Sequence, residues 1–274
     1  MVPCGRWWGA ARPKAPLFIV APVLEAVLWG VVQGITEFLP ISSDGHLVLI
    51  PALFGFAPPD LATTAVLHLG TLGAVVAYFR KDLWRLRLAR TDPSSRRMLW
   101  LLFIGSLPAG LALLFVDEVE RLQRSVTAAA LFLLVTGVVL VLVDRLRLGS
   151  RGMEQARPTD ALLIGFAQLL AILPGISRSG FTIATGLARG LERISAARFS
   201  FLLGVPAIAA AGLLELFSLA SDGGVPPAAW LGVGVAAVTG YLAISFLLRM
   251  LHRAGLSGYG IYCLAMGVLA LIVL

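Results

Sequence analysis

The sequence has few charged residues and almost no cysteine. Of its 274 residues only 14% are Asp, Glu, Lys or Arg, whereas 58% are hydrophobic, and the mean hydropathy is +0.90. Soluble domains are about half apolar and about a quarter charged, so this composition excludes a soluble enzyme, a coiled coil and a disordered chain. The two cysteines, Cys4 and Cys263, lie at opposite ends and form no CxxC or Cys/His pattern, which argues against a disulfide or a zinc site.

Acidic residues are scarce relative to basic ones. The chain has 22 Lys and Arg against 15 Asp and Glu, a formal net charge of +7. In a soluble protein this excess would suggest a nucleic-acid partner. In a hydrophobic chain the simpler explanation is that membrane proteins retain Lys and Arg in their cytoplasmic loops. We therefore expect a membrane-embedded protein with no nucleic-acid partner.

Apolar runs of about 20 residues recur along the chain and predict an all-α polytopic membrane protein. Six of them are predicted to be full transmembrane helices: Leu61–Tyr78, Met98–Val116, Val126–Val143, Ala197–Leu219, Ala228–Leu248 and Ser257–Leu274. Two further apolar regions, Val23–Phe56 and Ala161–Leu191, are interrupted near the middle by Pro, Gly and Ser. We predict re-entrant helix–loop–helix structures there, which a membrane tolerates only where irregular backbone is buried in protein or lines a wet cavity.

The basic residues predict how these helices are oriented. Only Arg121 and Arg124 fall in connections on one side of the membrane, whereas sixteen fall on the other: Arg80, Lys81, Arg85, Arg87, Arg90, Arg96, Arg97, Arg145, Arg147, Arg151, Arg157, Arg189, Arg193, Arg198, Arg249 and Arg253. The positive-inside rule places the larger group in the cytoplasm. That group flanks Ala161–Leu191 at both ends, so this region must enter and leave on the same face. The N-terminal tail, with three basic residues, then lies outside, against the rule.

The two interrupted regions resemble each other. Gly30-x-x-Gln33 precedes Leu39-Pro-Ile-Ser-Ser-Asp-Gly45, and Gly165-x-x-Gln168 precedes Leu173-Pro-Gly-Ile-Ser-Arg-Ser-Gly180. Each region is followed by three predicted spans, and because three is odd the second copy is inverted relative to the first. Chance sharing of such fragments is the alternative, but the charge pattern independently favours the repeat. We expect an N-terminal tail, 1-20, and one membrane domain, 21-274, with repeat one at about 22-145 and repeat two at about 159-274.

Ionisable residues inside the apolar regions are functional candidates, because inserting each charge costs roughly 2.5–3.5 kcal/mol. They are Glu25, Glu37, Asp44, His46, His68, Arg178 and Glu215. Four of them lie in or beside the two loops. His68 is equally compatible with a packing role and with a role in a site.

The residues around the two loops predict phosphate chemistry. Gln33 and Glu37, four residues apart, share one face of a helix, and their oxygens suit a hard cation completed by a substrate phosphate. The loops add serine hydroxyls, His46, Arg178 and two helix N-termini, which together supply a nucleophile, a proton carrier and positive charge for phosphoryl transfer. The alternatives are structural. Ser and Asp at a helix start are ordinary N-caps, and Arg178 is a natural ion-pair partner for Glu37.

These residues resemble the signature motifs of the bacterial undecaprenyl-diphosphate phosphatases, also called bacitracin-resistance proteins. The first motif here is Gln33-Gly-Ile-Thr-Glu-Phe-Leu-Pro-Ile-Ser-Ser-Asp-Gly-His46, and the second is Pro174-Gly-Ile-Ser-Arg-Ser-Gly180. The similarity continues through Ala196-Ala-Arg-Phe-Ser-Phe-Leu-Leu and Gly260-Ile-Tyr262 and covers the chain beyond the N-terminal tail. The pair of motifs is highly specific, whereas hydrophobic spans alone would not be.

The resemblance implies an enzyme that hydrolyses undecaprenyl diphosphate to undecaprenyl phosphate and inorganic phosphate. Such an enzyme recycles the lipid carrier for cell-wall synthesis and confers bacitracin resistance. The implied substrate is a polyprenyl diphosphate lipid, the implied cofactor is a divalent cation, Mg²⁺ or Ca²⁺, and a homodimer is left open. The implied location is the bacterial plasma (inner) membrane, with the active site facing the periplasm or the cell exterior.

The same resemblance assigns roles to residues of this chain. Catalysis falls to Ser43, His46 and Glu37, with either Ser43 or His46 as the nucleophile. The diphosphate ligands are Arg178, Ser42, Ser177, Ser179 and Gly180. The metal ligands are Glu37, with Gln33 and Asp44 as weaker candidates.

Four positions depart from the family pattern. Asp44 stands where the family usually has Ser or Thr, and this carboxylate beside the expected phosphate either binds metal or weakens anion binding. His68 and Thr64 stand where many members have Gln and Glu, and Cys263 stands where Arg commonly follows the tyrosine.

A transporter or flippase for a prenyl-phosphate lipid or a small anion is the rival hypothesis, because inverted repeats are also typical of transporters. Transport would require Arg178 but no nucleophile at Ser43.

Overall fold

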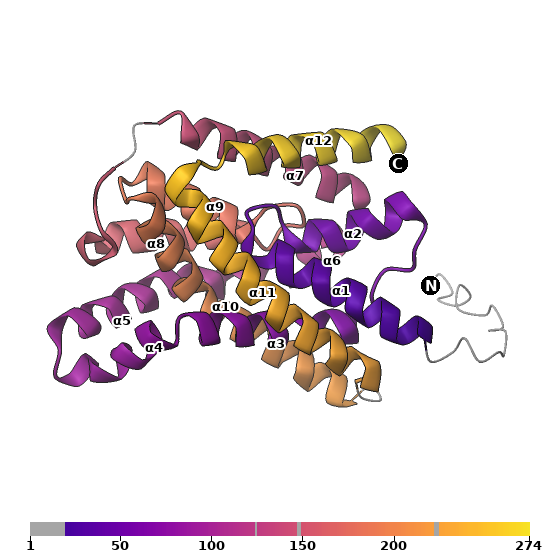
Figure 1. Cartoon of the computed structure of the whole chain (residues 1–274), viewed down its shortest axis with the longest axis horizontal. Helices are drawn as coiled ribbons and strands as arrows, with labels where there is room; N and C mark the ends of the chain where they lie inside the picture. The colour runs from indigo at the N-terminus through magenta and orange to yellow at the C-terminus, as the bar shows by residue number, and fades with distance from the viewer. Residues whose placement is uncertain (1–19, 124, 147–148, 222–224) are drawn as a thin grey trace.

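The computed structural model describes residues 20–123, 125–146, 149–221 and 225–274, and its regular elements in these ranges are all helices (Figure 1). Some of the residues discussed above lie outside the described part of the chain: residues 1–19 of the predicted tail, Arg124, Arg147 and the side chain of Glu215. In chain order the elements are α1 (Val20–Phe38), α2 (Ser43–Phe54), α3 (Leu61–Tyr78), α4 (Arg80–Leu86), η2 (Arg87–Arg90), α5 (Pro93–Ser106), η3 (Leu107–Leu114), α6 (Val116–Gln123), α7 (Val126–Asp144), η4 (Met153–Gln155), α8 (Pro158–Leu170), α9 (Arg178–Ala188), α10 (Arg193–Ser221), α11 (Pro227–Arg253) and α12 (Ser257–Val273).

Four helical segments in the described ranges are long and apolar enough to cross a membrane: Pro93–Leu114, Val126–Asp144, Arg193–Leu213 and Pro227–Arg253. The chain is therefore an all-helical, multi-pass membrane protein, which confirms the fold class predicted from composition. The other two predicted spans are present as shorter apolar helices, at Thr63–Tyr78 within α3 and Ser257–Val273 in α12.

The predicted span Met98–Val116 forms two joined helices. α5 passes into the 3-10 helix η3 at Leu107, because Pro108 has no N–H to donate and crowds the preceding turn. α5 starts earlier than predicted because Asp92 caps it, and hydrogen bonds from Ser95 and Ser94 lower the pKa of Asp92 to about 2. The sequence did not predict α4, η2 or α6, since short helices rich in charge resemble connecting loops.

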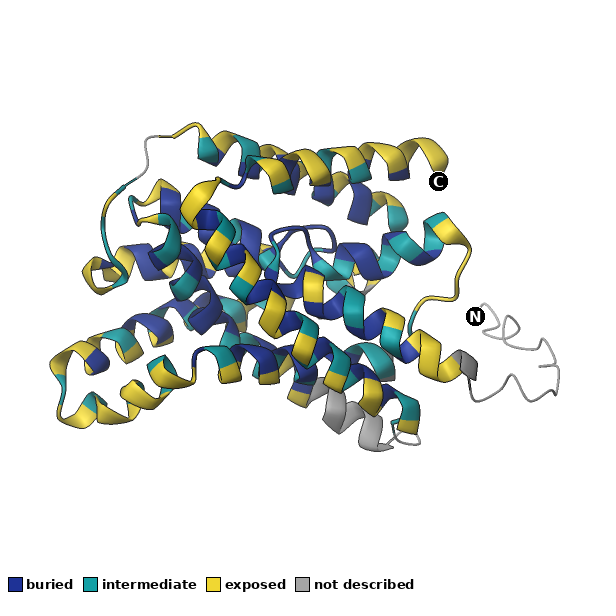
Figure 2. Cartoon of the chain, in the orientation of Figure 1, coloured by how far each residue is buried: buried dark blue, intermediate teal, exposed yellow. Residues whose placement is uncertain are grey.

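Each interrupted region folds into a helical hairpin with a buried turn. In hairpin one, residues 39–42 join α1 to α2, and in hairpin two, residues 171–177 join α8 to α9. Pro40 and Pro174 lie in these turns, where proline prevents the first helix from continuing. Both turns lie at the centre of the molecule, surrounded by the other helices, and are largely buried (Figure 2).

The helices of the two halves pack in matching pairs. α1 packs against α11 and α8 against α5, while α3 packs on α10 and α7 on α12. Glycines of the two GxxQ motifs permit the first two contacts. Gly30 faces the backbone of Gly232, and Gly165 faces the backbone of Gly105. A side chain at either position would collide with that backbone, so these close helix contacts depend on glycine.

Ion pairs connect the ends of several helices at one end of the bundle, which we call the basic end. The arginines belong to the group that the sequence placed on one side of the membrane. The pairs are Arg151–Asp160 at 2.8 Å, Arg189–Asp160 at 2.9 Å, Arg193–Asp144 at 3.3 Å and Arg198–Asp82 at 2.6 Å. Asp160 also accepts from the backbone amide of Arg157 and so caps the start of α8. The basic residues thus lie together because fixed contacts join their helices.

Candidate active site

The two buried turns present matching helix starts. Ser42 caps α2 and Ser177 caps α9, each accepting a hydrogen bond from the amide three residues ahead, at 3.2 and 3.1 Å. Serine favours this position because its hydroxyl satisfies a free amide of the first helical turn. Aligning the two caps places Ser43 and Arg178 at the same position, the first residue of the helix that follows each turn.

Both of these side chains bind one carboxylate. Ser43 Oγ donates to Glu37 Oε2 at 2.7 Å, and Arg178 Nη2 donates to Glu37 Oε1 at 2.8 Å. Gln33, one turn earlier on the same helix face, donates from Nε2 to Oε2 at 3.1 Å. Glu37 and Gln33 are buried, and a buried carboxylate is tolerated where donors and a positive charge compensate it. Glu37 therefore joins the predicted nucleophile of hairpin one to the arginine of hairpin two.

Two buried polar atoms beside Glu37 have no partner within the described part of the chain. They are Gln33 Oε1, an acceptor, and Arg178 Nη1, a donor. The guanidinium lies directly against Gly204 of α10, where a larger side chain would displace it. Buried polar groups are nearly always satisfied, so the chemistry of these two atoms indicates which further partners the site would accept. An anion fits the arginine nitrogen, and a cation or a hydrogen-bond donor fits the glutamine oxygen.

His46 is held by two hydrogen bonds, and neither is to Ser43. Its Nδ1 lies 2.7 Å from the Ser42 carbonyl oxygen, and its Nε2 lies 2.7 Å from the hydroxyl of Tyr262. The Tyr262 ring, from α12, stacks beside the imidazole with centroids 5.6 Å apart. The structure therefore places His46 in the first turn of α2, with a hydrogen-bond partner at each ring nitrogen.

Several predicted phosphate ligands also tie the turns together. Ser179 Oγ donates to the carbonyl oxygen of Leu39 at 3.1 Å, and Ser42 Oγ lies 3.4 Å from that of Ile176. Ser177 Oγ lies 3.3 Å from Ser179 Oγ, and all three serines are buried. Among the predicted diphosphate ligands whose side chains are described, the arginine is the one with a polar side-chain atom left unpartnered.

Asp44 and His68, two of the departures from the family pattern, lie within electrostatic reach of the site. Asp44 interacts with Glu37, Arg178 and His68, and His68 interacts with both carboxylates. The Nδ1 of His68 lies 3.0 Å from the carbonyl oxygen of Thr64, one turn earlier in α3. The sequence left His68 open between packing and a site, and its position favours the site.

The oxygen atoms around Glu37 fit a divalent cation only if other ligands complete its coordination shell. Among the described residues, no group of three His, Cys, Asp or Glu side chains is placed to hold a metal ion. Glu37 and the unpartnered Oε1 of Gln33 nevertheless offer oxygen ligands. Mg²⁺ commonly binds through one or two carboxylates and completes its shell with water and substrate phosphate. The residues therefore fit a cation that arrives with a phosphate ligand.

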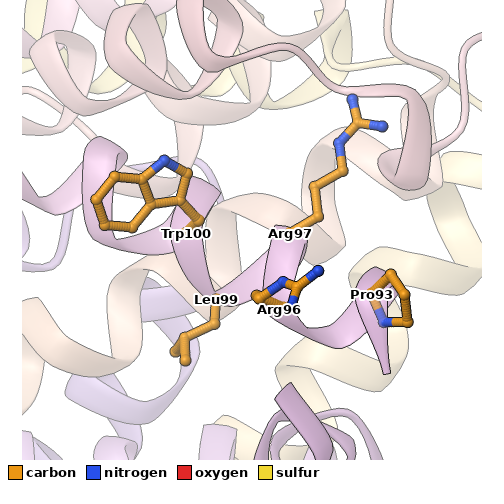
Figure 3. A pocket seen from close by; sticks show the side chains of 5 residues that line it. All are labelled: Pro93, Arg96, Arg97, Leu99 and Trp100. Carbon is orange, nitrogen blue, oxygen red and sulfur yellow. The ribbon is translucent and has the colours of Figure 1, made fainter. Parts of the chain in front are cut away.

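A separate cavity of about 510 Å³ lies at the start of α5 (Figure 3). Its lining residues are Pro93, Arg96, Arg97, Leu99 and Trp100. Arg97 also donates to the carbonyl oxygen of Ala156 at 2.8 Å, which places it beside the connection that leads into α8. None of the lining residues belongs to either hairpin, so this cavity is not part of the candidate active site.

Two residues that hold the site were not identified as functional from the sequence. Thr136 of α7 donates to the carbonyl oxygen of Gly175 at 2.8 Å and accepts from the amide of Ser177 at 3.1 Å. Tyr262 binds His46, as described above. A single Thr or Tyr in an apolar span gives no periodic signal. The resemblance at Gly260-Ile-Tyr262 implies no role for the tyrosine.

These features define an all-helical membrane protein in which a serine, a carboxylate and an arginine meet between two buried helix starts. Residues 26–269 match the family described as bacitracin resistance protein BacA. The chain therefore belongs to this family, as its two motifs predicted.

Similar proteins carry one common name. The chain is 45% identical over 271 residues to the undecaprenyl-diphosphatase of Thermomicrobium roseum, covering 92% of this chain and 98% of the relative. It is 42% identical to that of Myxococcus xanthus, covering 92% and 89%, and 44% identical to that of Moorella thermoacetica, covering 89% and 96%.

Proposed function

We propose that this protein hydrolyses undecaprenyl diphosphate to undecaprenyl phosphate and inorganic phosphate within the membrane. The observation that carries the proposal is the convergence of Ser43 and Arg178 on Glu37, at 2.7 and 2.8 Å. A hydroxyl with an adjacent proton acceptor is an activated nucleophile, and a guanidinium matches phosphate oxygens. The substrate is supported by the relatives named above, each of which is an undecaprenyl-diphosphatase.

In the first step Ser43 Oγ attacks the terminal phosphorus of the lipid diphosphate. A bond forms between Oγ and phosphorus, and the bond to the bridging oxygen breaks, so that the electron pair leaves with undecaprenyl phosphate. Glu37 accepts the Oγ proton through the hydrogen bond already present. Arg178, whose Nη1 has no partner in the described structure, binds the oxygens on which charge accumulates.

In the second step water attacks the phosphoserine. Glu37 returns its proton to Ser43 Oγ as the bond between Oγ and phosphorus breaks, and dihydrogen phosphate leaves with both protons of the water. Ser43 is favoured over His46 as the nucleophile, because both nitrogens of His46 already have hydrogen-bond partners. A divalent cation held by Glu37, Gln33 and substrate oxygens, with Asp44 as a weaker ligand, would neutralise negative charge on the phosphates.

The proposed topology is an inverted repeat with two re-entrant hairpins and six spans. The first helix of each half packs on a helix of the other half, α1 on α11 and α8 on α5. This packing supports the inverted topology, because the same glycine contact occurs in both halves. The basic end then faces the cytoplasm of a bacterial plasma membrane, and hairpin one opens toward the outer face. A polyprenyl chain would lie in lipid while its diphosphate reaches the two turns.

The rival hypothesis, a transporter or flippase, is not favoured. The similar proteins bear the name of an enzyme. Binding and moving an anion would not require the hydrogen bond that directs Ser43 at a carboxylate.

The test is phosphate release from undecaprenyl diphosphate by protein purified in detergent. Wild type should turn over, and Ser43→Ala and Arg178→Ala should each lose on the order of 100- to 10,000-fold in kcat/KM. Ser150→Ala and Arg90→Ala are matched controls at exposed positions and should behave like wild type. EDTA should lower the wild-type rate, with recovery on added Mg²⁺ or Ca²⁺. No release by folded wild type, with lipid binding retained, would make transport the leading hypothesis.

A further inference from the structure

Tyr262 connects the last helix of the chain to the first turn of α2. Its hydroxyl lies 2.7 Å from His46 Nε2, and the two rings are nearly parallel, with an interplanar angle of 7°. His46 is 2% exposed, whereas Tyr262 is 40% exposed. The tyrosine is therefore the exposed member of this pair, and its hydroxyl is the partner of Nε2.

The hydrogen-bond pattern assigns a tautomer to His46. The carbonyl oxygen of Ser42 can only accept, so its 2.7 Å contact with Nδ1 is a hydrogen bond only in the tautomer that carries a hydrogen on Nδ1. In the neutral imidazole Nε2 is then an acceptor, and the Tyr262 hydroxyl donates to it. Neither nitrogen is left to serve Ser43, whose hydroxyl donates to Glu37.

The carbonyl that His46 binds belongs to a strained residue. Ser42 has a φ of 70°, and no other described non-glycine residue has a positive φ. Such a conformation is strained for a residue with a side chain and persists only where surrounding contacts hold it. The Ser42 carbonyl accepts from His46 twice, from the backbone amide at 3.2 Å and from Nδ1 at 2.7 Å. Ser43, the next residue, takes its direction from this turn.

We propose that Tyr262 is a positioning residue of the active site, which fixes the Nδ1–H tautomer of His46 and so holds the strained Ser42 turn that directs Ser43 at Glu37. The tautomer part stands on geometry alone, and the effect on turnover rests on the proposed function. Tyr262 need not touch the substrate, because it acts through His46 and the Ser42 carbonyl.

The chain offers a matched control on the same helix. Tyr259 is one turn away from Tyr262 on α12, and its buried hydroxyl has no hydrogen-bond partner within the described residues. Tyr262→Phe and Tyr259→Phe each remove one hydroxyl from α12 and leave the ring in place. The two variants thus differ chiefly in whether a hydrogen bond to His46 is lost.

Two measurements test the proposal. Nitrogen-15 spectra of the histidine rings, with His46 assigned through His46→Gln, should show the Nδ1–H tautomer in wild type and Tyr259→Phe and a mixture of tautomers in Tyr262→Phe. With undecaprenyl diphosphate, Tyr262→Phe should lower kcat about 10- to 100-fold with KM within about twofold, and Tyr259→Phe should change neither.

The outcomes separate this proposal from the proposed function. An unchanged His46 tautomer in folded Tyr262→Phe would overturn the inference, as would equal kinetic effects of the two tyrosine changes. If wild type releases no phosphate, the spectra still decide whether Tyr262 sets the tautomer. In that case the failure lies with the proposed function.

Discussion

The two hairpins use the same position of the same motif for opposite chemical roles. The residue after the serine cap is Ser43 in hairpin one and Arg178 in hairpin two, and both side chains bind Glu37. One copy thus supplies a neutral hydroxyl that donates to the carboxylate, and the other supplies a fixed positive charge. The comparison teaches that a repeat can build an asymmetric site when a single carboxylate, present in one copy only, joins the two.

The hairpins also differ in how their turns are held. In hairpin two, Thr136 binds the backbone of the turn at Gly175 and at Ser177, and Gly175 adopts a φ of 94°, which glycine tolerates. In hairpin one a serine occupies the positive-φ position, and the turn depends on His46 and its partner Tyr262. The turn that leads to Ser43, the proposed nucleophile, is strained, and the turn that leads to Arg178 is relaxed.

The largest expected effect comes from breaking the shared carboxylate. Glu37→Gln removes the proton acceptor of Ser43 and the ion-pair partner of Arg178, so phosphate release should fall on the order of 100- to 10,000-fold. Because Ser43 and Glu37 act in one step, the double variant Glu37→Gln/Ser43→Ala should be no slower than the worse single variant. Rates that multiply in the double variant would show that the two residues act independently.

A smaller effect should follow from loosening hairpin two alone. Thr136→Val keeps the shape of the side chain but leaves the Gly175 carbonyl and the Ser177 amide without their partner, at a cost of about 1–2 kcal/mol in unfolding free energy. Turnover should also fall, because Arg178 would bind phosphate less tightly. The main kinetic effect should be a higher KM. Thermal unfolding in detergent and steady-state kinetics measure both.

The control for this change lies on the same helix. Thr127 of α7 is exposed, and Thr127→Val should leave stability and KM as in wild type. Equal effects at the two threonines would mean that the contact between Thr136 and the turn has no special role.

The smallest effect tests the strain in hairpin one. Ser42→Gly and Ser177→Gly both remove a serine cap and both add flexibility to the unfolded chain. Only Ser42 has a positive φ, so glycine relieves strain there and not at Ser177. Ser42→Gly should therefore be the more stable variant by about 1 kcal/mol, measured as the difference between their thermal unfolding curves. If Ser177→Gly is equally stable, Ser42 stores no strain.

Much of the site could be predicted from the sequence because its contacts are local or carried by motifs. Gln33 and Glu37 are one helical turn apart, and they bind each other as that spacing predicts. The pairing of Arg178 with Glu37 was foreseen as a structural alternative to phosphate binding. The present ion pair does not exclude phosphate, since a second guanidinium nitrogen of Arg178 remains without a partner in the described structure.

Other parts of the site could not be predicted, because they depend on which helices become neighbours. Thr136 and Tyr262 contact residues that are 39 and 216 positions away in the chain, and nothing in their own segments indicates those partners. The backbone strain at Ser42 is equally hidden, since serine at a helix start is usually an ordinary cap. The short charged helices between the spans were missed for a different reason, because composition alone does not separate them from loops.

The ion pair between Arg178 and Glu37 also bears on how the two halves of the repeat would work together. The carboxylate contacts Nη2 of Arg178 at 2.8 Å, whereas Nη1 has no partner in the described structure. On the proposed function, a phosphate bound at Nη1 would share the guanidinium with Glu37 and would lie within reach of the serine that binds the same carboxylate. Substrate binding by one half of the repeat and reaction at the other half would then meet at a single side chain.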